Sequence, residues 1–495
     1  MSILVTSYIN GEWVKVKDDG FRIPFINPAT EETLGHVQEA DHNEVHQAVL
    51  AAQQTFARGD WSKNIELRKK ALFQLATLVR KNQDLLAQKE VACTGIPISQ
   101  VLSRHIPRAA QNFEFFAEFI SQSSSPVFEQ NPHYLTFVRH EPVGVAGLIA
   151  PWNAPLALAS MKIAGAIAFG NSCVFKPSEF TPLSFTILLE LTREAGIPHG
   201  VINMVNGRGA VTGNAIVSHP LIRSLCFTGG TATGKEISAI AGQTLKKAVY
   251  ELGGKSANII CADADLDRAL DGALLSIFSN NGQQCLAGSR ILLEDSIYED
   301  FTNRFIKRVS QLRIGDPLLP TTELGPIFSK EQFNKVSNYI SIAKEAKDIT
   351  ILYGGESASG FKKGFYIQPT IISTHNTAHI LCQEEIFGPF VALLRFSNID
   401  EAISIANQSE FGLVCYIWSS QIKRIMQVLS QVQAGVIWVN TPLTRELRAP
   451  FGGYKNSGVG RDGGVWSRAL FTEEKTITIP TTDFPMIKLG SITNE

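Results

Sequence analysis

The sequence predicts an α/β protein with more than one domain, on the evidence of its length and its short apolar runs. Its 495 residues, 44% of them hydrophobic, are too many for one compact core, so we expect two or three domains. From about residue 143, apolar runs alternate with helix-length segments, as buried parallel strands do. These runs are Val143 to Ala150, Ser172 to Phe175 and Val201 to Val205. Alternation resumes after Ser256 to Cys261, which indicates a second α/β domain.

Two further regions have periodic patterns. From Leu67 to Val91, leucine and valine recur at helical spacing between Arg and Lys, which predicts one amphipathic helix. Between the first helices and the strands, Asn131-Pro132 precedes an alternating run from Tyr134 to Val138, which predicts a hairpin. The tail run from Lys475 to Ile479 also alternates, and the hairpin or its counterpart on another subunit is the expected partner.

Composition excludes several classes of function. A formal net charge of -1 gives no general attraction to nucleic acid or to an anionic membrane. The 7 cysteines are odd in number and form no Cys-x-x-Cys pair, which predicts reduced thiols and no metal site. The N-terminus has no signal-peptide pattern and no window reaches membrane-spanning length, so we expect a soluble cytoplasmic protein.

Two motifs contain residues suited to covalent chemistry. Cys285 ends the stretch Phe278-Ser-Asn-Asn-Gly-Gln-Gln-Cys285, where Gly282 and polar amides would leave a thiol partly open. Glu251 begins Glu251-Leu-Gly-Gly-Lys255, a carboxylate beside mobile backbone that suits a general base. A core cysteine and a surface glutamate are the alternatives for each residue taken alone.

Three other motifs lie where strands are expected to end. Phe227-Thr-Gly-Gly-Thr-Ala-Thr-Gly234-Lys precedes a helix expected from near Lys235 and would offer backbone N–H groups to phosphate, although a tight turn explains it equally well. Lys176 and Glu179 follow a strand and would bind ribose hydroxyls, or form a surface salt bridge. Asn153, between two prolines, suits an oxyanion donor or a structural turn.

These motifs occur together in one order that resembles the NAD(P)-dependent aldehyde dehydrogenase superfamily. The resemblance extends from Asn10-Gly-Glu-Trp13 to the final strand. It is carried by Pro151-Trp-Asn153, Lys176-Pro-Ser-Glu179, Phe227-Thr-Gly229, Glu251-Leu-Gly-Gly-Lys255, Gly282-Gln-Gln-Cys285, Glu384-Glu-Ile-Phe-Gly-Pro389 and Pro450-Phe-Gly-Gly-Tyr-Lys-x-Ser-Gly458.

The resemblance implies a role for each catalytic candidate. Cys285 would attack the aldehyde, and Glu251 would activate the water that hydrolyses the thioester. Asn153 and the Cys285 N–H would hold the oxyanion. Lys162 matches a lysine of the family's proton relay, with a solvated lysine as the alternative. Asp462 stands where a glutamate is common, and its shorter side chain puts a relay role there in doubt.

The resemblance also implies an NAD site without a metal. Glu179 favours NAD over NADP because a carboxylate repels a 2'-phosphate. Lys176 and Glu179 would hold the adenosine ribose, and Glu385 with Phe387 the nicotinamide ribose. The full set of expected cofactor residues is Ile149, Trp152, Lys176, Ser178, Glu179, Gly229, Gly230, Glu385 and Phe387.

The implied fold is a Rossmann-like cofactor domain, an α/β catalytic domain and a small β oligomerisation arm. The cofactor domain would comprise residues 1–119 and 143–250, and the catalytic domain residues 251–465. The arm would comprise residues 120–142 and 466–495. Strand addition across subunits would cover exposed edges, which predicts a homodimer or homotetramer.

The substrate prediction depends on arginines. His105-Ile-Pro-Arg108 and Arg445-Glu-Leu-Arg448 resemble the muconic semialdehyde dehydrogenase branch, in which arginines meet a substrate carboxylate. Phe451 would line the same tunnel. Surface pairing of Arg445 or Arg448 with Glu446 is the alternative. Oxidation of a neutral or cationic aldehyde, as in betaine-aldehyde-like enzymes, and a catalytically silent structural member stay open.

Overall fold

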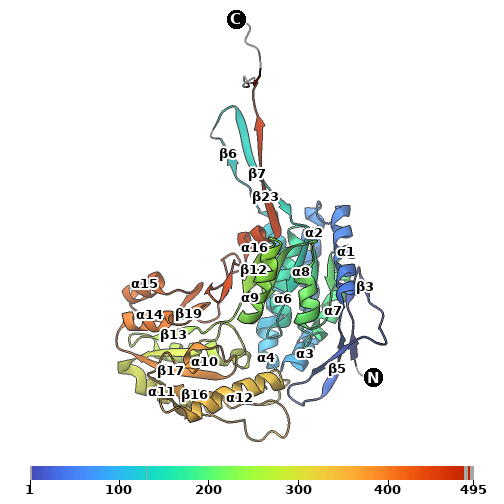
Figure 1. Ribbon diagram of the computed structural model, residues 1–495. Helices are drawn as coiled ribbons and strands as arrows, with labels where there is room; N and C mark the ends of the chain where they lie inside the picture. The colour runs from blue at the N-terminus through green and yellow to red at the C-terminus, as the bar shows by residue number, and fades with distance from the viewer. Residues whose placement is uncertain (1–2, 130, 484–485, 487–488, 491–495) are drawn as a thin grey trace.

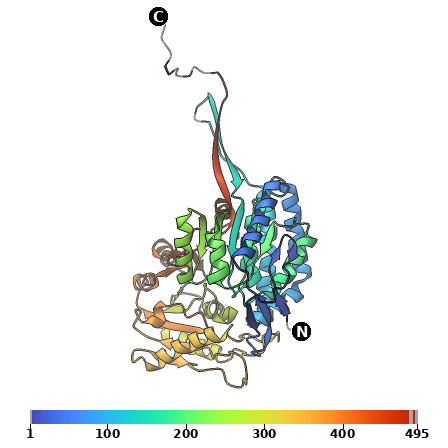
Figure 2. The same cartoon turned by 45° about the vertical axis from the view of Figure 1, so that its right-hand side comes forward.

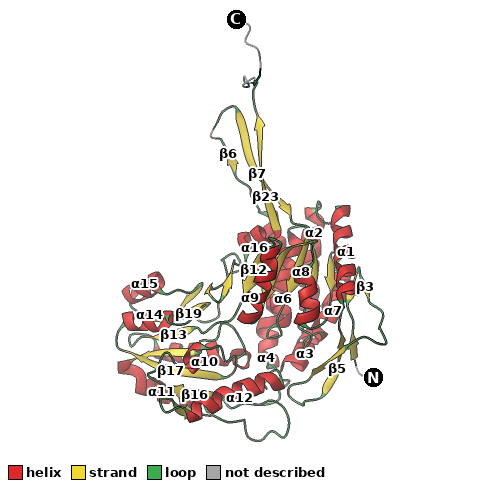
Figure 3. Cartoon of the chain, viewed as in Figure 1, coloured by secondary structure: helices red, strands yellow, loops and turns green. Residues whose placement is uncertain are grey.

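The computed structural model describes residues 3–129, 131–483, 486 and 489–490. Two large sheets with helices on their faces make up the body of the molecule, and a narrow β arm projects from it (Figures 1 and 3). The predicted α/β fold class is confirmed. Within the described residues, no helix combines the length and the apolar character needed to cross a membrane.

The first sheet has 8 strands in the order β22-β12-β11-β8-β9-β10-β2-β3. Its five central strands, from β12 to β10, are parallel, and three of them are the predicted apolar runs after residue 143. Every residue of β9 is buried, as expected for a parallel strand covered on both faces. The strands are β2 (Tyr8–Ile9), β3 (Glu12–Trp13), β8 (Val145–Ile149), β9 (Ser172–Lys176), β10 (Ile202–Met204), β11 (Ile222–Thr228), β12 (Lys247–Glu251) and β22 (Gly458–Val459).

The helix predicted from residue 67 to 91 is two helices, α2 and α3, divided at Asn82. The Asn82 side chain donates a hydrogen bond to the Leu78 carbonyl at 2.9 Å, and such local bonding of asparagine competes with helix continuation. The helices of this part are α1 (His42–Arg58), α2 (Ile65–Lys81), α3 (Gln83–Thr94), α4 (Ile98–Gln100), η1 (Val101–His105), α5 (Ile106–Ser121), α6 (Pro155–Ala168), α7 (Leu183–Glu194), η2 (Gly209–Gly213), α8 (Asn214–Ser218) and α9 (Thr231–Gln243).

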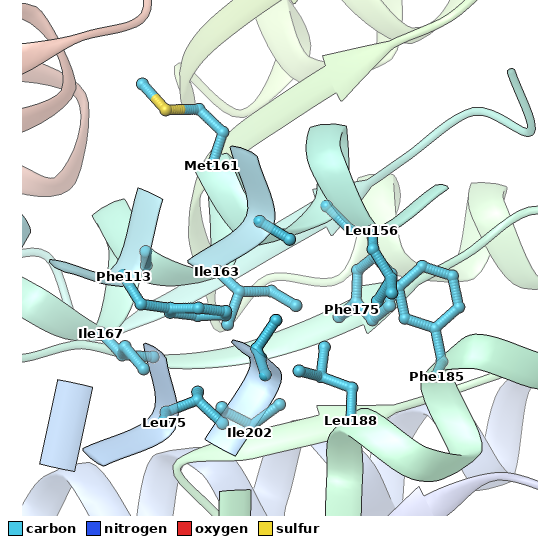
Figure 4. Packing of buried hydrophobic residues seen from close by; sticks show 14 of the residues in the cluster. Leu75, Phe113, Leu156, Met161, Ile163, Ile167, Phe175, Phe185, Leu188 and Ile202 are labelled. Atoms are coloured by element: carbon cyan, nitrogen blue, oxygen red, sulfur yellow. The ribbon is translucent and has the colours of Figure 1, made fainter. Parts of the chain in front are cut away.

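A large apolar core joins these helices to the sheet. Figure 4 shows Phe113 of α5 and Ile163 of α6 close to Leu75 of α2, with Phe175 of β9 nearby. All four side chains are almost completely buried. Deleting a buried phenylalanine side chain costs about 3–5 kcal/mol, so this packing holds α6, and Lys162 on it, firmly against the sheet.

The second sheet has 7 strands in the order β15-β16-β17-β14-β13-β19-β20, parallel except at the β15 edge. The predicted run from residue 256 to 261 forms β13, next to its centre. The strands are β13 (Ala257–Ile260), β14 (Arg290–Glu294), β15 (Thr350–Tyr353), β16 (Thr370–Ser373), β17 (Phe390–Phe396), β19 (Val414–Trp418) and β20 (Val436–Val439). Its helices are α10 (Leu266–Phe278), η3 (Ser279–Gly282), η4 (Asp295–Ile297), α11 (Tyr298–Val309), α12 (Lys330–Glu345), α13 (Ile380–Gln383), α14 (Ile399–Asn407) and α15 (Ile422–Gln431). Helix α16 (Gly464–Phe471) packs instead against α6 and β12 of the first part.

The arm is a three-stranded antiparallel sheet of β6 (Val127–Phe128), β7 (Tyr134–Pro142) and β23 (Thr472–Pro480), and it is seen edge-on in Figure 2. The tail strand pairs with the hairpin of its own chain, from Thr472 opposite Pro142 to Pro480 opposite Tyr134. Both strands are longer than predicted. Two small sheets complete the fold, formed by β1 (Ile3–Val5), β5 (Thr33–Gln38) and β4 (Arg22–Ile26), and by β18 (Phe411–Gly412) and β21 (Tyr454–Lys455).

Candidate active site

Three candidate residues and the strand end that precedes Gly229 lie at the carboxyl ends of neighbouring parallel strands. Glu251 ends β12, Thr228 ends β11, Ile149 ends β8 and Lys176 ends β9, and these four strands are adjacent in the first sheet. The carboxyl edge of a parallel sheet is where α/β proteins bind ligands, because the loops that leave the strands meet there. The topology therefore brings together motifs separated by up to about a hundred residues.

The turn before Cys285 has a constrained backbone. Asn280, Asn281 and Gly282 all have positive φ, at 59°, 57° and 73°. A side chain at Gly282 would collide with the Gly388 backbone at 2.3 Å, which only glycine avoids. The Asn281 amide donates to the carbonyls of Gly95 and Pro326, each at 3.0 Å, so the turn is tied to two distant loops.

Asn153 lies beside this turn and is buried. Its Nδ2 donates to the Gln283 backbone carbonyl at 3.0 Å, and its backbone carbonyl accepts from Asn280 Nδ2 at 2.6 Å. The first bond orients the side-chain amide, and the second fixes the backbone that carries it. Because a carboxamide carries two N–H hydrogens, one donor remains after the bond to Gln283.

Cys285 is half-buried, and its thiol is strongly held in the protonated form. Burial, together with the carboxylates of Glu385 and Glu251, raises the pKa of Cys285 to about 12. Glu385 Oε1 accepts a hydrogen bond from the Gly254 N–H at 2.8 Å, and the Gly254 backbone in turn lies against the Cys285 carbonyl. Burial raises the pKa of Glu385 as well.

Glu251 is buried, and neither carboxylate oxygen has a hydrogen-bond partner among the described residues. Burial and the nearby Asp462 raise its pKa well above the ordinary glutamate value, against the opposing charges of Lys162, Arg445 and Arg461. Gly452 provides room for the carboxylate, because a side chain there would lie 2.7 Å from Oε1.

Lys162 is buried and contacts a residue that the sequence interpretation missed. Its Nζ donates to Cys226 Sγ at 3.3 Å and lies 4.0 Å from Asp462 Oδ2. Burial lowers its pKa, but Cys226 and Asp462 outweigh burial, and the net pKa is raised. Lys162 is thus not a solvated surface lysine.

The expected cofactor residues surround an open helix start. Helix α9 begins at Thr231, four residues before the expected start, with Gly230 as its N-cap. A side chain at Gly230 would meet no atom within 4 Å, whereas one at Gly229 would strike the Phe227 ring. An open helix N-terminus reached through small residues fits a phosphate group.

The remaining cofactor candidates form an ion pair and an aromatic cluster. Lys176 Nζ lies 3.1 Å from Glu179 Oε2. The Trp152 ring stacks on Phe328 with 4.0 Å between ring centroids, and Phe387 meets its edge at 5.5 Å. Ser178 is buried in the same loop as Glu179. These residues fit a ligand with a ribose and an aromatic ring.

Arg108 and Arg445, two of the expected substrate arginines, lie near Arg104, which the sequence interpretation did not include. Arg104 and Arg108, one helical turn apart, face the same way, and each pKa is lowered by burial. Burial also lowers the pKa of Arg445 to about 10, and its guanidinium lies over the Phe451 ring at 4.0 Å. The spacing of four residues between Arg104 and Arg108 was the signal for Arg104 in the sequence.

Arg448 does not join this group, which corrects the expectation for that residue. It is exposed and forms a paired contact with Glu446, with Nε and Nη2 at 3.0 and 2.9 Å from the carboxylate oxygens. The surface pairing that the sequence left open for either arginine therefore applies to Arg448. Arg445, three residues earlier, turns inward.

The site combines a half-buried cysteine, a buried carboxylate and an open helix start at one edge of a two-sheet α/β body. The chain belongs to the aldehyde dehydrogenase family, whose model matches residues 13–477. It is 41% identical over 477 residues to human retinal dehydrogenase 2, covering 95% of this chain and 91% of that protein. It is also 41% identical over 470 residues to 5-carboxymethyl-2-hydroxymuconate semialdehyde dehydrogenase of Escherichia coli, covering 94% and 98%. The solved NAD+ complex of an aldehyde dehydrogenase from Bacillus cereus superposes with a TM-score of 0.94 at 38% identity, covering 97% of each chain.

Proposed function

We propose that this aldehyde dehydrogenase uses NAD to oxidise an aldehyde that also carries a carboxylate. The observation that carries the proposal is the group formed by Arg104, Arg108 and Arg445. The charge of Arg104 lowers the pKa of Arg108, and the charge of Arg108 lowers the pKa of Arg445. The three charges therefore lie close together. The phenol of Tyr416 lies near both this group and Cys285. Burial and Cys285 raise the pKa of the phenol, and the charge of Arg104 lowers it.

The three guanidiniums form no salt bridge with a carboxylate among the described residues. Arg108 Nη1 is buried and has no hydrogen-bond partner there. The charges of Asp462 and Glu251 act on Arg445, whereas burial dominates at Arg104, and burial with the charge of Arg104 dominates at Arg108. Burying the Arg104 and Arg108 charges side by side without an acidic partner is costly, and a bidentate carboxylate offsets that cost better than any neutral group. A cationic substrate would add to the repulsion, which argues against a betaine-like aldehyde.

The proposed chemistry assigns one task to each residue. The Cys285 thiol loses its proton to solvent and its Sγ adds to the aldehyde carbon, while the free Asn153 N–H and the Cys285 backbone N–H stabilise the oxyanion. NAD supplies the acceptor for the hydride that leaves this carbon, and a thioester remains on Cys285. Glu251 then takes a proton from water, the water oxygen bonds to the acyl carbon and the carbon–sulfur bond breaks. Glu251 passes this proton to the departing sulfur, so the products are the acid and the Cys285 thiol.

The proposed cofactor site places NAD across α9 and β9. The Gly229 and Gly230 backbone and the start of α9 would bind the pyrophosphate, with Lys176 and Glu179 on the adenosine ribose. Arg208, whose charge reaches Glu179, is held by Glu39 through bonds of 2.8 and 2.7 Å and is already neutralised. This leaves Glu179 to repel a 2'-phosphate. Glu385 would release Gly254 to bind the nicotinamide ribose, which removes one charge that raises the pKa of Cys285.

The substrates that fit best are the semialdehydes of aromatic-ring catabolism, such as hydroxymuconic or carboxymethyl-hydroxymuconic semialdehyde. The similarity to the Escherichia coli semialdehyde enzyme supports this class. The equal identity to retinal dehydrogenase 2 makes a neutral apolar aldehyde the second candidate. A catalytically silent protein is the least supported alternative, because Cys285, Glu251 and Asn153 are all present.

A pair of aldehydes of equal chain length, one ending in a carboxylate and one in a methyl group, tests the substrate class. We expect Arg108→Ala to raise KM for the anionic aldehyde by about tenfold or more and to change KM for the neutral one little. Arg448→Ala is the matched control, since that arginine is exposed and paired with Glu446. Equal losses for both aldehydes would leave a general aldehyde dehydrogenase without a carboxylate clamp.

We also propose the setting in which the enzyme works. The arm leaves strand edges and the exposed Val127, Phe128 and Ile479 at the surface, which supports a homodimer or homotetramer. The absence of a membrane-spanning helix among the described residues is compatible with the proposed cytoplasmic location. We propose the same three parts as the sequence predicts: a cofactor domain of residues 1–119 and 143–250, a catalytic domain of residues 251–465, and an arm of residues 120–142 and 466–495.

A further inference from the structure

The Lys162 side chain ends in a buried polar cluster that the proposed chemistry does not yet explain. Cys226, in the middle of strand β11, is 1% exposed. Its Sγ lies 3.3 Å from Lys162 Nζ and 3.8 Å from Asp462 Oδ1. The thiol therefore stands between a buried ammonium and a buried carboxylate that are themselves 4.0 Å apart.

We propose that Cys226 is a positioning residue for Glu251, because it connects Lys162 to Asp462 across a gap that the short aspartate side chain does not close. The inference rests on the proposed role of Glu251 as the hydrolytic base. Lys162 donates to the sulfur, and the S–H donates to Asp462. Cys226 is the hydrogen-bond acceptor of the ammonium among the described residues.

The backbone prevents Asp462 from closing the gap by itself. Its N–H and carbonyl both pair with Phe451 at 2.8 Å, and Gly463 follows at a φ of 114°. Lys162 is equally confined, since α6 is packed into the apolar core. The thiol lies between these two confined groups and contacts both of them.

The electrostatic consequence reaches Glu251. The charged or titratable groups that act on this carboxylate include Asp462, Lys162, Arg445 and Arg461, and the Cys285 and Cys226 thiols also interact with it. Lys162 is one of the charges that oppose the rise in the pKa of Glu251. A buried ammonium without an acceptor loses stability and gives up its proton more readily. Removing the thiol therefore weakens the Lys162 charge and raises the pKa of Glu251 further.

The test follows thioester hydrolysis as a function of pH, by intact-protein mass after acid quench of a single turnover with NAD and an aldehyde. We expect Cys226→Ala to form the acyl-enzyme at the wild-type rate but to hydrolyse it about tenfold more slowly. The acid limb of hydrolysis should move up by about one pH unit. Cys226→Ser, which keeps a hydroxyl as donor and acceptor, should stay close to wild type.

A second variant tests the bridging directly. In Cys226→Ala/Asp462→Glu the carboxylate is one methylene longer and reaches the ammonium without a bridge, so both the rate and the acid limb should return toward wild type. The matched control is Cys173→Ala, which removes an equally buried thiol from the neighbouring part of the same sheet. Thermal unfolding of each variant shows whether the fold is retained.

A Cys226→Ala profile that superimposes on those of wild type and Cys173→Ala would overturn the inference. Failure of both serine and the glutamate variant to restore the acid limb would do the same and would assign Cys226 to packing. Glu251→Gln is measured in parallel. If it stalls hydrolysis while Cys226→Ala changes nothing, this inference alone fails. If Glu251→Gln hydrolyses at the wild-type rate, the proposed base fails and this inference with it.

Discussion

Burial governs the two residues on which the proposed chemistry depends. The pKa of Cys285 and that of Glu251 are both raised, so in this state the thiol is protonated and the carboxylate is a stronger base than an exposed one. Two nearby carboxylates, Glu385 and Glu251, act in the same direction on the thiol. Burial is the largest cause of the raised pKa, so neutralising or moving either carboxylate away lowers the pKa of the thiol only in part.

The raised pKa of Glu251 has a direct consequence for pH dependence. A general base acts only when ionised, so the rate of hydrolysis is greatest above the pKa of Glu251 and falls as the pH falls through that pKa. Because the pKa is raised, we expect the acid limb above the ordinary glutamate value of about 4.3. The rate of acyl-enzyme decay, measured from about pH 5 to about pH 9, locates this limb.

Replacement of the same residue separates the two halves of the reaction. Glu251→Gln should give a burst of NADH followed by turnover slowed about a hundredfold or more, because the thioester forms but lacks its base. Glu446→Gln, an exposed acid, is the control, and Cys285→Ala should abolish even the burst. Unchanged steady-state turnover of Glu251→Gln would remove Glu251 from the hydrolytic role.

At the scale of elements, the site depends on where strands end and helices begin. Helix α9 follows β11 after a two-residue turn, so its free N–H groups open at the carboxyl edge of the sheet. The Lys176–Glu179 pair stands at the end of β9 on the same edge. In the proposed cofactor site, the helix start would attract the pyrophosphate, whereas the Glu179 carboxylate would repel a further phosphate on the ribose.

This arrangement predicts the cofactor preference. We expect kcat/KM to be higher with NAD than with NADP, because Glu179 repels the 2'-phosphate. Glu179→Gln should narrow the difference, while Glu194→Gln, an exposed acid at the end of α7, should leave it unchanged. A wild-type preference for NADP would contradict this interpretation of Glu179.

At the scale of the whole molecule, three parts of the chain meet around one site. Strand β22 shows how closely they are joined. Val459, in the segment expected to belong to the catalytic domain, pairs with Tyr250 of the expected cofactor domain, about two hundred residues earlier in the chain. A side chain at Gly458 would collide with the Tyr250 carbonyl at 2.2 Å. The polar cluster likewise joins three distant segments, because Lys162 lies on α6, Cys226 on β11 and Asp462 just before α16.

The arm leads to a prediction for the assembly. Phe128→Glu places a charge on the exposed edge strand β6, and we expect it to shift the particle toward smaller species in light scattering after gel filtration. Leu245→Glu, at a residue 89% exposed on the body, is the control. If wild type were a monomer, or if Phe128→Glu kept the wild-type mass, β6 would not be an assembly edge.

Local patterns were sufficient for the strands and for the candidates at their ends. The runs at 143–150, 172–175 and 201–205 became β8, β9 and β10 because a buried parallel strand is apolar along its own length. The hairpin and tail strand were predicted from alternation, and their pairing within one chain agrees with one of the two expected partners. The break at Asn82 and the early start of α9 were missed, since each depends on a few backbone hydrogen bonds.

The sequence by itself determined the α/β class, the family resemblance and the identity of Cys285, Glu251 and Asn153 as candidates, because those signals are carried by neighbouring residues. Only the tertiary structure decided that Arg104 joins Arg108 and Arg445 while Arg448 pairs with Glu446. Only the structure revealed Cys226 between Lys162 and Asp462. The physical reason is that burial and through-space charge depend on which distant segments pack together, and sequence spacing contains no record of that packing.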